Sequence, residues 1–126
     1  MKSSRNGINP NITKDGSEIR ELLHPDQHDV RNQSLAEATV PVGTTTLLHR
    51  HHRTEEIYHV TEGKGIMTLG NERFPVAAGD SICIAPGTPH CIKNSGSGTL
   101  VILCCCSPAY AHEDTELLER PSRSSS

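Results

Sequence analysis

The sequence predicts an all-β domain, a sandwich or a barrel. Short runs with hydrophobic residues at every second position follow one another through most of the chain. Each run is bounded by glycine, proline, asparagine or aspartate, the residues that turns favour. Helical periodicity is nearly absent, so many short strands at this spacing indicate two packed antiparallel sheets or a closed barrel.

We expect the strands in the following order. A first short strand covers Ile19–Leu23, and a loop with the turn signal Pro25-Asp26 follows it. The remaining expected strands are Leu35–Val40, Thr44–His51, Glu56–Glu62, Ile66–Leu69, Arg73–Val76, Ser81–Ile84, His90–Lys93 and Thr99–Cys106. Glu113–Glu119 is interpreted as a short helix or a last strand.

The two ends of the chain lack this pattern. Residues 1–18 are rich in Asn, Ser, Gly and Lys, and we interpret them as a flexible N-terminal segment. Residues 19–119 form the β-barrel, and residues 120–126 form a flexible tail. His24 and His28, in the loop after the first strand, are expected to be exposed.

Length and composition exclude several functions. A chain of 126 residues forms one domain. Its formal net charge of -3 leaves no basic excess for nucleic acid, and its three aromatic residues are too few for a base-stacking platform. No apolar run is long enough to span a bilayer, and the first ten residues lack the hydrophobic region of a signal peptide. We therefore expect a cytoplasmic protein with a small-molecule ligand, and neither nucleic acid nor membrane as a partner.

The five cysteines include the consecutive residues Cys104, Cys105 and Cys106, and none forms a CxxC pair. An odd number without paired spacing fits a reducing compartment better than a disulfide framework. Alternation along a strand sends Cys104 and Cys106 to one face and Cys105 to the other. We interpret the three as packing residues, because free cysteine packs as a small hydrophobe.

Four residues predict a metal site. On a strand, His49 and His51 point to the same face, where they present two imidazoles side by side. Glu56, at the start of the next strand, and His90 complete the set. Three neutral imidazoles and one carboxylate suit one divalent transition metal ion, such as Fe, Mn, Ni, Zn or Cu, better than Mg or Ca.

The spacing around these residues resembles that of the cupin family. Five residues separate Gly43 from His49, one separates His49 from His51, four separate His51 from Glu56, and six separate Glu56 from Gly63. This looks like the first cupin motif. The second motif is matched by Gly79, Pro86-Gly87, His90 and Asn94, with Ala85 where the family usually has proline. The resemblance covers roughly residues 34–107.

The resemblance implies a single-domain double-stranded β-helix, the cupin jelly roll, with His49, His51, Glu56 and His90 as the metal ligands. Small members of the family are commonly homodimers, and Ile19–Leu23 offers a strand that could pair with the sheet edge of a neighbour. Asn94 is expected to cap a turn.

Two alternatives for the ligand set stay open. His52 replaces His51 if the strand bulges, although it then lies across the strand from His49. Glu55 replaces Glu56 if the register shifts. The family spacing favours Glu56, which turns Tyr58 inward with it and leaves Glu55 and His59 facing outward.

Tyr58 is the candidate catalytic residue, because it is the one inward polar aromatic near the ligands. Its hydroxyl acts as a general acid or donates to a substrate oxyanion, or else the ring only closes the barrel. Four protein ligands leave two positions of a six-coordinate ion for a substrate. The leading function is a Lewis-acid enzyme of the isomerase, lyase or decarboxylase type, acting on a small oxygen-rich metabolite. The alternatives are a non-haem metal-dependent dioxygenase and a non-catalytic sugar or carboxylate binding protein.

Overall fold

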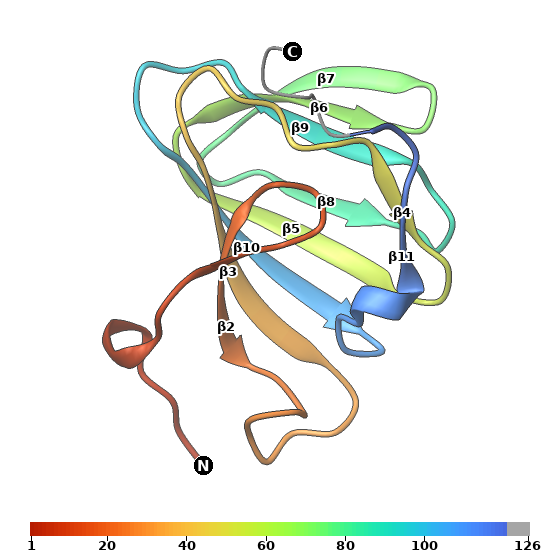
Figure 1. The fold of residues 1–126 in the computed structure, drawn as a ribbon. Helices are drawn as coiled ribbons and strands as arrows, with labels where there is room; N and C mark the ends of the chain where they lie inside the picture. Colours follow the sequence, from red (N-terminus) through yellow and green to blue (C-terminus); the bar gives the residue numbers. More distant parts are fainter. Residues whose placement is uncertain (121–126) are drawn as a thin grey trace.

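The chain folds into two antiparallel β-sheets that face each other, as the computed structural model of residues 1–120 describes (Figure 1). The first sheet has the strand order β1-β2-β3-β10-β5-β8 and the second has the order β11-β4-β9-β6-β7. Neighbours in the sheets are often far apart in sequence, which is the arrangement of a jelly roll. The predicted double-stranded β-helix is confirmed.

The strands of the first sheet are β1 (Asn11–Ile12), β2 (Glu18–Leu23), β3 (Ser34–Val40), β10 (Leu100–Ser107), β5 (Glu55–Glu62) and β8 (Ser81–Ile84). Those of the second are β11 (Thr115–Leu117), β4 (His49–His51), β9 (His90–Asn94), β6 (Lys64–Leu69) and β7 (Glu72–Ala77). Two 3-10 turns complete the described chain, η1 (Arg5–Gly7) and η2 (His112–Asp114).

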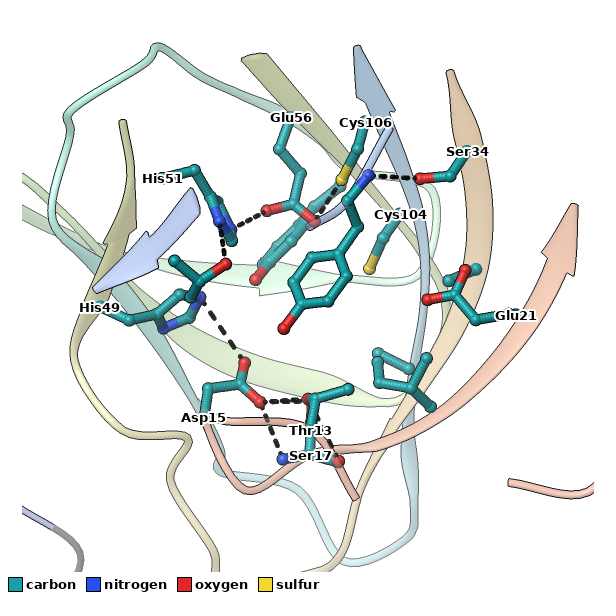
Figure 2. Close-up of a pocket in the computed structure, with 16 residues that line it drawn as sticks. Thr13, Asp15, Ser17, Glu21, Ser34, His49, His51, Glu56, Cys104 and Cys106 are labelled. Carbon is teal, nitrogen blue, oxygen red and sulfur yellow. Dashed lines mark hydrogen bonds and ion pairs between the residues drawn. The ribbon is translucent and has the colours of Figure 1, made fainter. Parts of the chain in front are cut away.

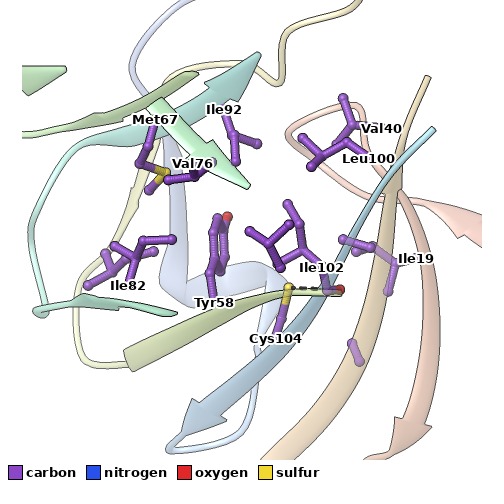
Figure 3. Packing of buried hydrophobic residues seen from close by; sticks show 14 residues of the cluster. Ile19, Val40, Tyr58, Met67, Val76, Ile82, Ile92, Leu100, Ile102 and Cys104 are labelled. Carbon is purple, nitrogen blue, oxygen red and sulfur yellow. Dashed lines mark hydrogen bonds between the residues drawn. The ribbon is translucent and has the colours of Figure 1, made fainter. Parts of the chain in front are cut away.

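The hydrophobic core lies between the two sheets. Alternate residues of β3, β5 and β10 point inward, so Val60, Leu100 and Ile102 are at most 1% exposed. Figure 3 shows Leu100 and Ile102 opposite Met67 and Ile92 of the second sheet. Each buried aliphatic side chain of this size stabilises the fold by roughly 1.5–3 kcal/mol. This packing holds the two sheets at a fixed separation, and the candidate site lies between them.

The strand expected over Thr44–His51 is shorter in the structure. Only His49–His51 form β4, and Thr45 makes an isolated bridge to Lys93. The reason is that the intervening backbone bonds elsewhere: the Leu47 amide donates to the Asp15 carbonyl at 2.8 Å. The register of the two histidines is unaffected, because β11 pairs with β4 from His49 to His51.

The expected first strand is present as β2, but it pairs with β3 of its own chain. Its inward residue Ile19 joins the core. On its other side lies β1, only two residues long. The loop between β1 and β2 then passes over the end of the barrel that holds the histidines. The flexibility of residues 1–18 stays a prediction, and the predicted tail lies almost wholly outside the described residues.

The structure also decides the predictions for the C-terminal segment and for the Pro86-Gly87 turn. Glu113–Glu119 contains both a helical turn, η2, and a strand, β11. Pro86-Gly87 turns the chain despite Ala85: the Thr88 amide donates to the Ala85 carbonyl at 3.1 Å, and Gly87 has a φ of 81° that favours glycine.

The exposure predicted for His24 is wrong, because this side chain is buried and its Nε2 lies 2.7 Å from the Tyr110 carbonyl. No helix among residues 1–120 is long and apolar enough to cross a membrane.

Candidate metal centre

Three buried histidines meet between the sheets, at one end of the barrel. His49 and His51 project from the same face of β4, and His90 begins β9 directly opposite His49. Their exposed fractions are 3%, 4% and 0%. One ring nitrogen from each can be chosen so that all three lie within 4.8 Å of one another. The prediction that His49 and His51 point to the same face of one strand is therefore confirmed.

Hydrogen bonds fix the tautomers of His49 and His90. His49 Nδ1 lies 2.7 Å from the Leu47 carbonyl, and His90 Nδ1 lies 2.9 Å from the Thr88 carbonyl. A carbonyl oxygen only accepts, so each Nδ1 carries the proton and donates it. In the neutral ring, Nε2 is then an unprotonated nitrogen with a lone pair. This arrangement is the one that metal-binding histidines commonly have.

His51 reaches the same state through a side chain. Its Nδ1 lies 2.9 Å from Thr115 Oγ1, and that hydroxyl gives its own proton to the Ala111 carbonyl at 3.0 Å. Thr115 therefore accepts from His51, and Nε2 of His51 also points a lone pair inward when the ring is neutral. All three Nε2 atoms are thus available to a cation. His90 Nε2 is buried and has no hydrogen-bond partner among the described residues.

Glu56 comes from β5, on the opposite sheet, and faces the histidines. Its Oε1 lies 3.1 Å from His51 Nε2 and 3.6 Å from His90 Nε2. Burial raises the pKa of this carboxyl, but the hydrogen bond to His51 and the proximity of His51 and His90 outweigh burial and lower the pKa to about 2. A carboxylate facing nitrogen lone pairs needs a positive charge between them, supplied by a proton or a metal ion.

The electrostatics of His49 favour the neutral ring. Burial lowers its pKa most, the nearby His90 lowers it further, and Asp15 partly offsets these effects. A neutral imidazole is the form that binds metals. Asp15 Oδ2 lies 3.7 Å from His49 Nε2, so a second carboxylate approaches the cluster from the loop between β1 and β2 (Figure 2).

Tyr58 lies in the same pocket, on the wall formed by β5. Its ring meets that of His90 edge-on, with the centroids 5.9 Å apart. Burial, followed by the charge of Glu56, raises its pKa well above 10, so the hydroxyl stays protonated at neutral pH. Among the described residues no hydrogen bond to this hydroxyl is found, which leaves it free to donate to a ligand.

The alternative ligands face away from the cluster. His52 is half exposed and forms an ion pair with Glu116 at 3.2 Å. Glu55 is exposed, and His59, half-buried, contacts Ser81 Oγ at 2.8 Å. The expected inward set of His49, His51, Glu56 and His90 is thus the set that the structure brings together.

Four residues around the pocket were not singled out from the sequence. They are Asp15, Glu21, Tyr110 and Thr115. Tyr110 packs edge-on against His51 with the ring centroids 5.9 Å apart. None belongs to a spacing pattern, because each reaches the pocket through contacts between distant segments. The one available signal was a polar, hydroxyl-rich composition in Thr13–Ser17.

The cysteines divide between the strand faces as predicted, with Cys104 and Cys106 buried and Cys105 exposed. Packing is not the only role of these cysteines, since Cys106 Sγ donates a hydrogen bond to Glu56 Oε2 at 3.3 Å. Burial, then the charge of Glu56, raises the pKa of the Cys106 thiol. The protonated thiol therefore holds the second carboxylate oxygen while Oε1 faces the histidines. Asn94 caps a turn as expected, accepting from the Gly96 amide at 2.9 Å.

Comparison with known proteins agrees with this geometry. The profile of the cupin domain family matches residues 36–106. An uncharacterised protein of Methanocaldococcus jannaschii is 59% identical over 94% of this chain and 95% of its own length. An oxalate-binding protein of Thermotoga maritima is 29% identical over 68% of this chain and 71% of its own length.

Solved structures show the same fold. A predicted oxalate decarboxylase from Thermotoga maritima superposes with a TM-score of 0.75 at 26% identity, covering 86% of this chain and 99% of that one. The Streptomyces nucleoside dehydratase Pac13 superposes with a TM-score of 0.77 at 20% identity, covering 97% and 93%. At such identity the second likeness concerns the fold alone.

Proposed function

Because the chain belongs to the cupin family, we propose that it binds one divalent transition metal ion through His49, His51, Glu56 and His90. The observation that carries this proposal is the convergence of three Nε2 lone pairs, one of them buried without a partner. Removing such groups from water is unfavourable unless a partner compensates. The donor set fits Fe, Mn, Ni or Zn, with expected ligand distances of about 2.0–2.2 Å.

We further propose that the protein is an enzyme acting on a small oxygen-rich metabolite. An ion held here supplies Lewis acidity to a carbonyl or carboxylate oxygen. The chain's own residues do the rest: Thr115, Leu47 and Thr88 orient the three imidazoles, and Cys106 orients Glu56. Tyr58 keeps its proton at neutral pH, so its hydroxyl donates to the developing negative charge of the substrate.

The reaction class proposed is that of an isomerase, lyase or decarboxylase. Support comes from the solved structures with the same fold, which include proteins described as a predicted oxalate decarboxylase and a nucleoside dehydratase. These descriptions concern other proteins, and the fold by itself hosts many activities. A binding role without turnover is the second candidate, favoured by the relative named as an oxalate-binding protein.

Metal analysis of the purified full-length chain is the first test. We expect one transition metal ion per chain after expression or after reconstitution, and loss of that ion on His51→Ala. A protein that takes up no Fe, Mn, Ni or Zn would overturn the proposal. A substrate panel under air and under argon then separates the reaction classes: turnover that disappears under argon indicates a dioxygenase, and binding without turnover indicates the binding role.

A cytoplasmic homodimer is proposed from the sequence and the family. Because β2 pairs with β3 of its own chain, the dimer contact expected there is limited to the other edge of β2, which β1 covers over only two residues. Light scattering of the full-length chain tests the dimer. A monomer at high concentration would contradict it.

A further inference from the structure

The charged residues lining the pocket are acidic. Besides its histidines, the pocket is lined by the carboxyl groups of Asp15, Glu21 and Glu56, and no lysine or arginine of the described chain lines it. Lys14 is next to Asp15 in sequence, but its Nζ donates to the carbonyls of His112 and Thr115 at 3.1 and 2.7 Å. A negatively charged substrate therefore finds no cationic side chain in this pocket.

Asp15 is held in one position by its own loop. Its Oδ1 accepts three hydrogen bonds, from Thr13 Oγ1 at 2.9 Å, the Ser17 amide at 2.9 Å and Ser17 Oγ at 2.6 Å. Its carbonyl accepts from the Leu47 amide, two residues before His49. Oδ2 is left to face His49 Nε2 at 3.7 Å, and the side chain is 12% exposed. The carboxylate thus stays beside the histidines without a rearrangement of the loop.

Glu21 provides a second acidic group in the pocket. It lies on β2, and Figure 2 shows it across the pocket from His49 and His51. Its Oε2 is buried without a hydrogen-bond partner among the described residues. Burial raises the pKa of this carboxyl, an effect that His24 partly offsets. Such a group accepts a hydrogen bond from a hydroxyl, or donates one when protonated.

We infer that this site takes a small uncharged compound carrying hydroxyl and carbonyl oxygens, and that Asp15 makes it discriminate against dicarboxylates. Of the reaction classes proposed above, this substrate fits an isomerase or a lyase, because a decarboxylase acts on a carboxylate. The inference rests on the proposed metal site. A divalent ion is already balanced by the carboxylates of Glu56 and Asp15 before a substrate enters. A dianion brings excess negative charge next to a fixed carboxylate, whereas a hydroxyl group finds acceptors in Asp15 and Glu21.

The size of the cavity agrees with a small ligand. The space free for the centres of water molecules is about 40 Å³, which is room for a few waters. Ala36, Ala38 and Ile19 form the apolar part of the wall. The pocket therefore combines one metal-binding side, one acidic side and a short apolar patch.

The test measures how one charge changes the affinity for ligands of graded charge. Full-length wild type and Asp15→Asn are loaded with the same metal to equal occupancy, and calorimetry gives the Kd of oxalate, of its monoanionic amide oxamate and of uncharged dihydroxyacetone. Asparagine keeps the size of the side chain and removes its charge. We expect oxalate to bind roughly tenfold to a hundredfold more tightly to Asp15→Asn, oxamate to gain less, and dihydroxyacetone to gain nothing.

Two further variants serve as controls for this experiment. Glu55→Gln removes a similar charge from the exposed face of β5, and all three affinities should match those of wild type. Asp15→Ser removes the charge with a different side chain and should repeat the trend if Asp15→Asn folds poorly. Equal gains for all three ligands, or no gain for oxalate, would overturn the inference and leave the metal site standing. A protein that takes up no metal would overturn both.

Discussion

The two sides of the pocket are built in different ways. On one side, His49, His51 and His90 come from β4 and β9, and two of their Nδ1 partners lie only two residues away in sequence. The acidic side, as we call the two carboxylates that the N-terminal part of the chain contributes, consists of Asp15 from the loop before β2 and Glu21 from β2 itself. That loop is held by contacts such as Lys14 Nζ to the Thr115 carbonyl, which joins residues 101 positions apart.

This difference separates binding of the ion from choice of the substrate. The histidine side is set by strand geometry, by backbone carbonyls at His49 and His90, and by Thr115 of β11 at His51, so it persists wherever the same strands form. The acidic side depends on Glu21 of β2 and on one loop, which holds Asp15, and loops tolerate substitution more readily than strands do. We therefore expect substitutions on the histidine side to abolish metal binding, and those on the acidic side to alter specificity or stability.

The largest effect is expected from His51→Ala, with His52→Ala as its matched control. His51 is buried and faces Glu56, whereas its neighbour His52 is half exposed and pairs with Glu116. Losing one of four ligands should remove the ion during desalting, while His52→Ala should retain it. Elemental analysis of both purified variants measures this. Equal metal content in the two variants would show that the histidine side does not bind the ion as proposed.

Tyr58→Phe should lower turnover without releasing the metal. The substitution keeps the ring against His90 and removes only the hydroxyl, which has a raised pKa and is available as a donor. Loss of a general acid lowers kcat by roughly 10²–10⁴. Steady-state kinetics with any substrate that the panel identifies, at verified metal content, gives the result. An unchanged kcat would assign Tyr58 to the barrel wall and leave its ring a packing role.

Metal removal should destabilise the fold by a moderate amount. An ion present at a thousandfold excess over its Kd stabilises the folded state by about 4 kcal/mol, and one kcal/mol moves Tm by a few degrees in a domain of this size. A chelator should therefore lower Tm by on the order of 10 °C in the wild type. The same chelator should leave the Tm of His51→Ala unchanged. A chelator-induced shift of the same size in that variant would point to an ion bound elsewhere.

The contrast between the two sides also explains what could be predicted from the sequence. The strands from Ser34 to Ser107 largely follow the alternation of hydrophobic residues, and His49 and His51 lie on one face because strand geometry places i and i+2 together. His90 and Glu56 join them from other strands, at the positions that the cupin spacing predicts. Glu56 was chosen over Glu55 on spacing alone, and the structure agrees, with Glu56 buried and Glu55 exposed. Local rules and the family spacing together sufficed for these residues.

Local rules did not suffice for Asp15, Glu21 or the burial of His24. Asp15 reaches His49 because the Leu47 amide bonds to the Asp15 carbonyl, and the same bond makes β4 start later than the sequence predicts, at His49 rather than at Thr44. Thr115 orients His51 across 64 positions of the chain. No periodic pattern in residues 1–18 predicts such contacts, because they depend on the packing of segments that are remote in sequence.

The smallest expected effect comes from Glu21→Gln and concerns stability against pH. Burial raises the pKa of Glu21 above its ordinary value of 4.5, so ionising this carboxyl is harder in the folded chain than in the unfolded one. The stability associated with the raised pKa is present below pH 4.5 and is lost as the pH rises through the folded pKa. Glutamine never ionises. The variant should therefore have a higher Tm than wild type at pH 7 and a similar Tm at pH 4, in both cases without metal.

Glu18→Gln, on the other face of β2, is the matched control and should show no such pH-dependent gain. If Glu21→Gln is instead less stable than wild type at pH 7, a partner in the folded chain stabilises the Glu21 carboxylate of the wild type. This carboxylate then needs no hydrogen bond from a substrate hydroxyl.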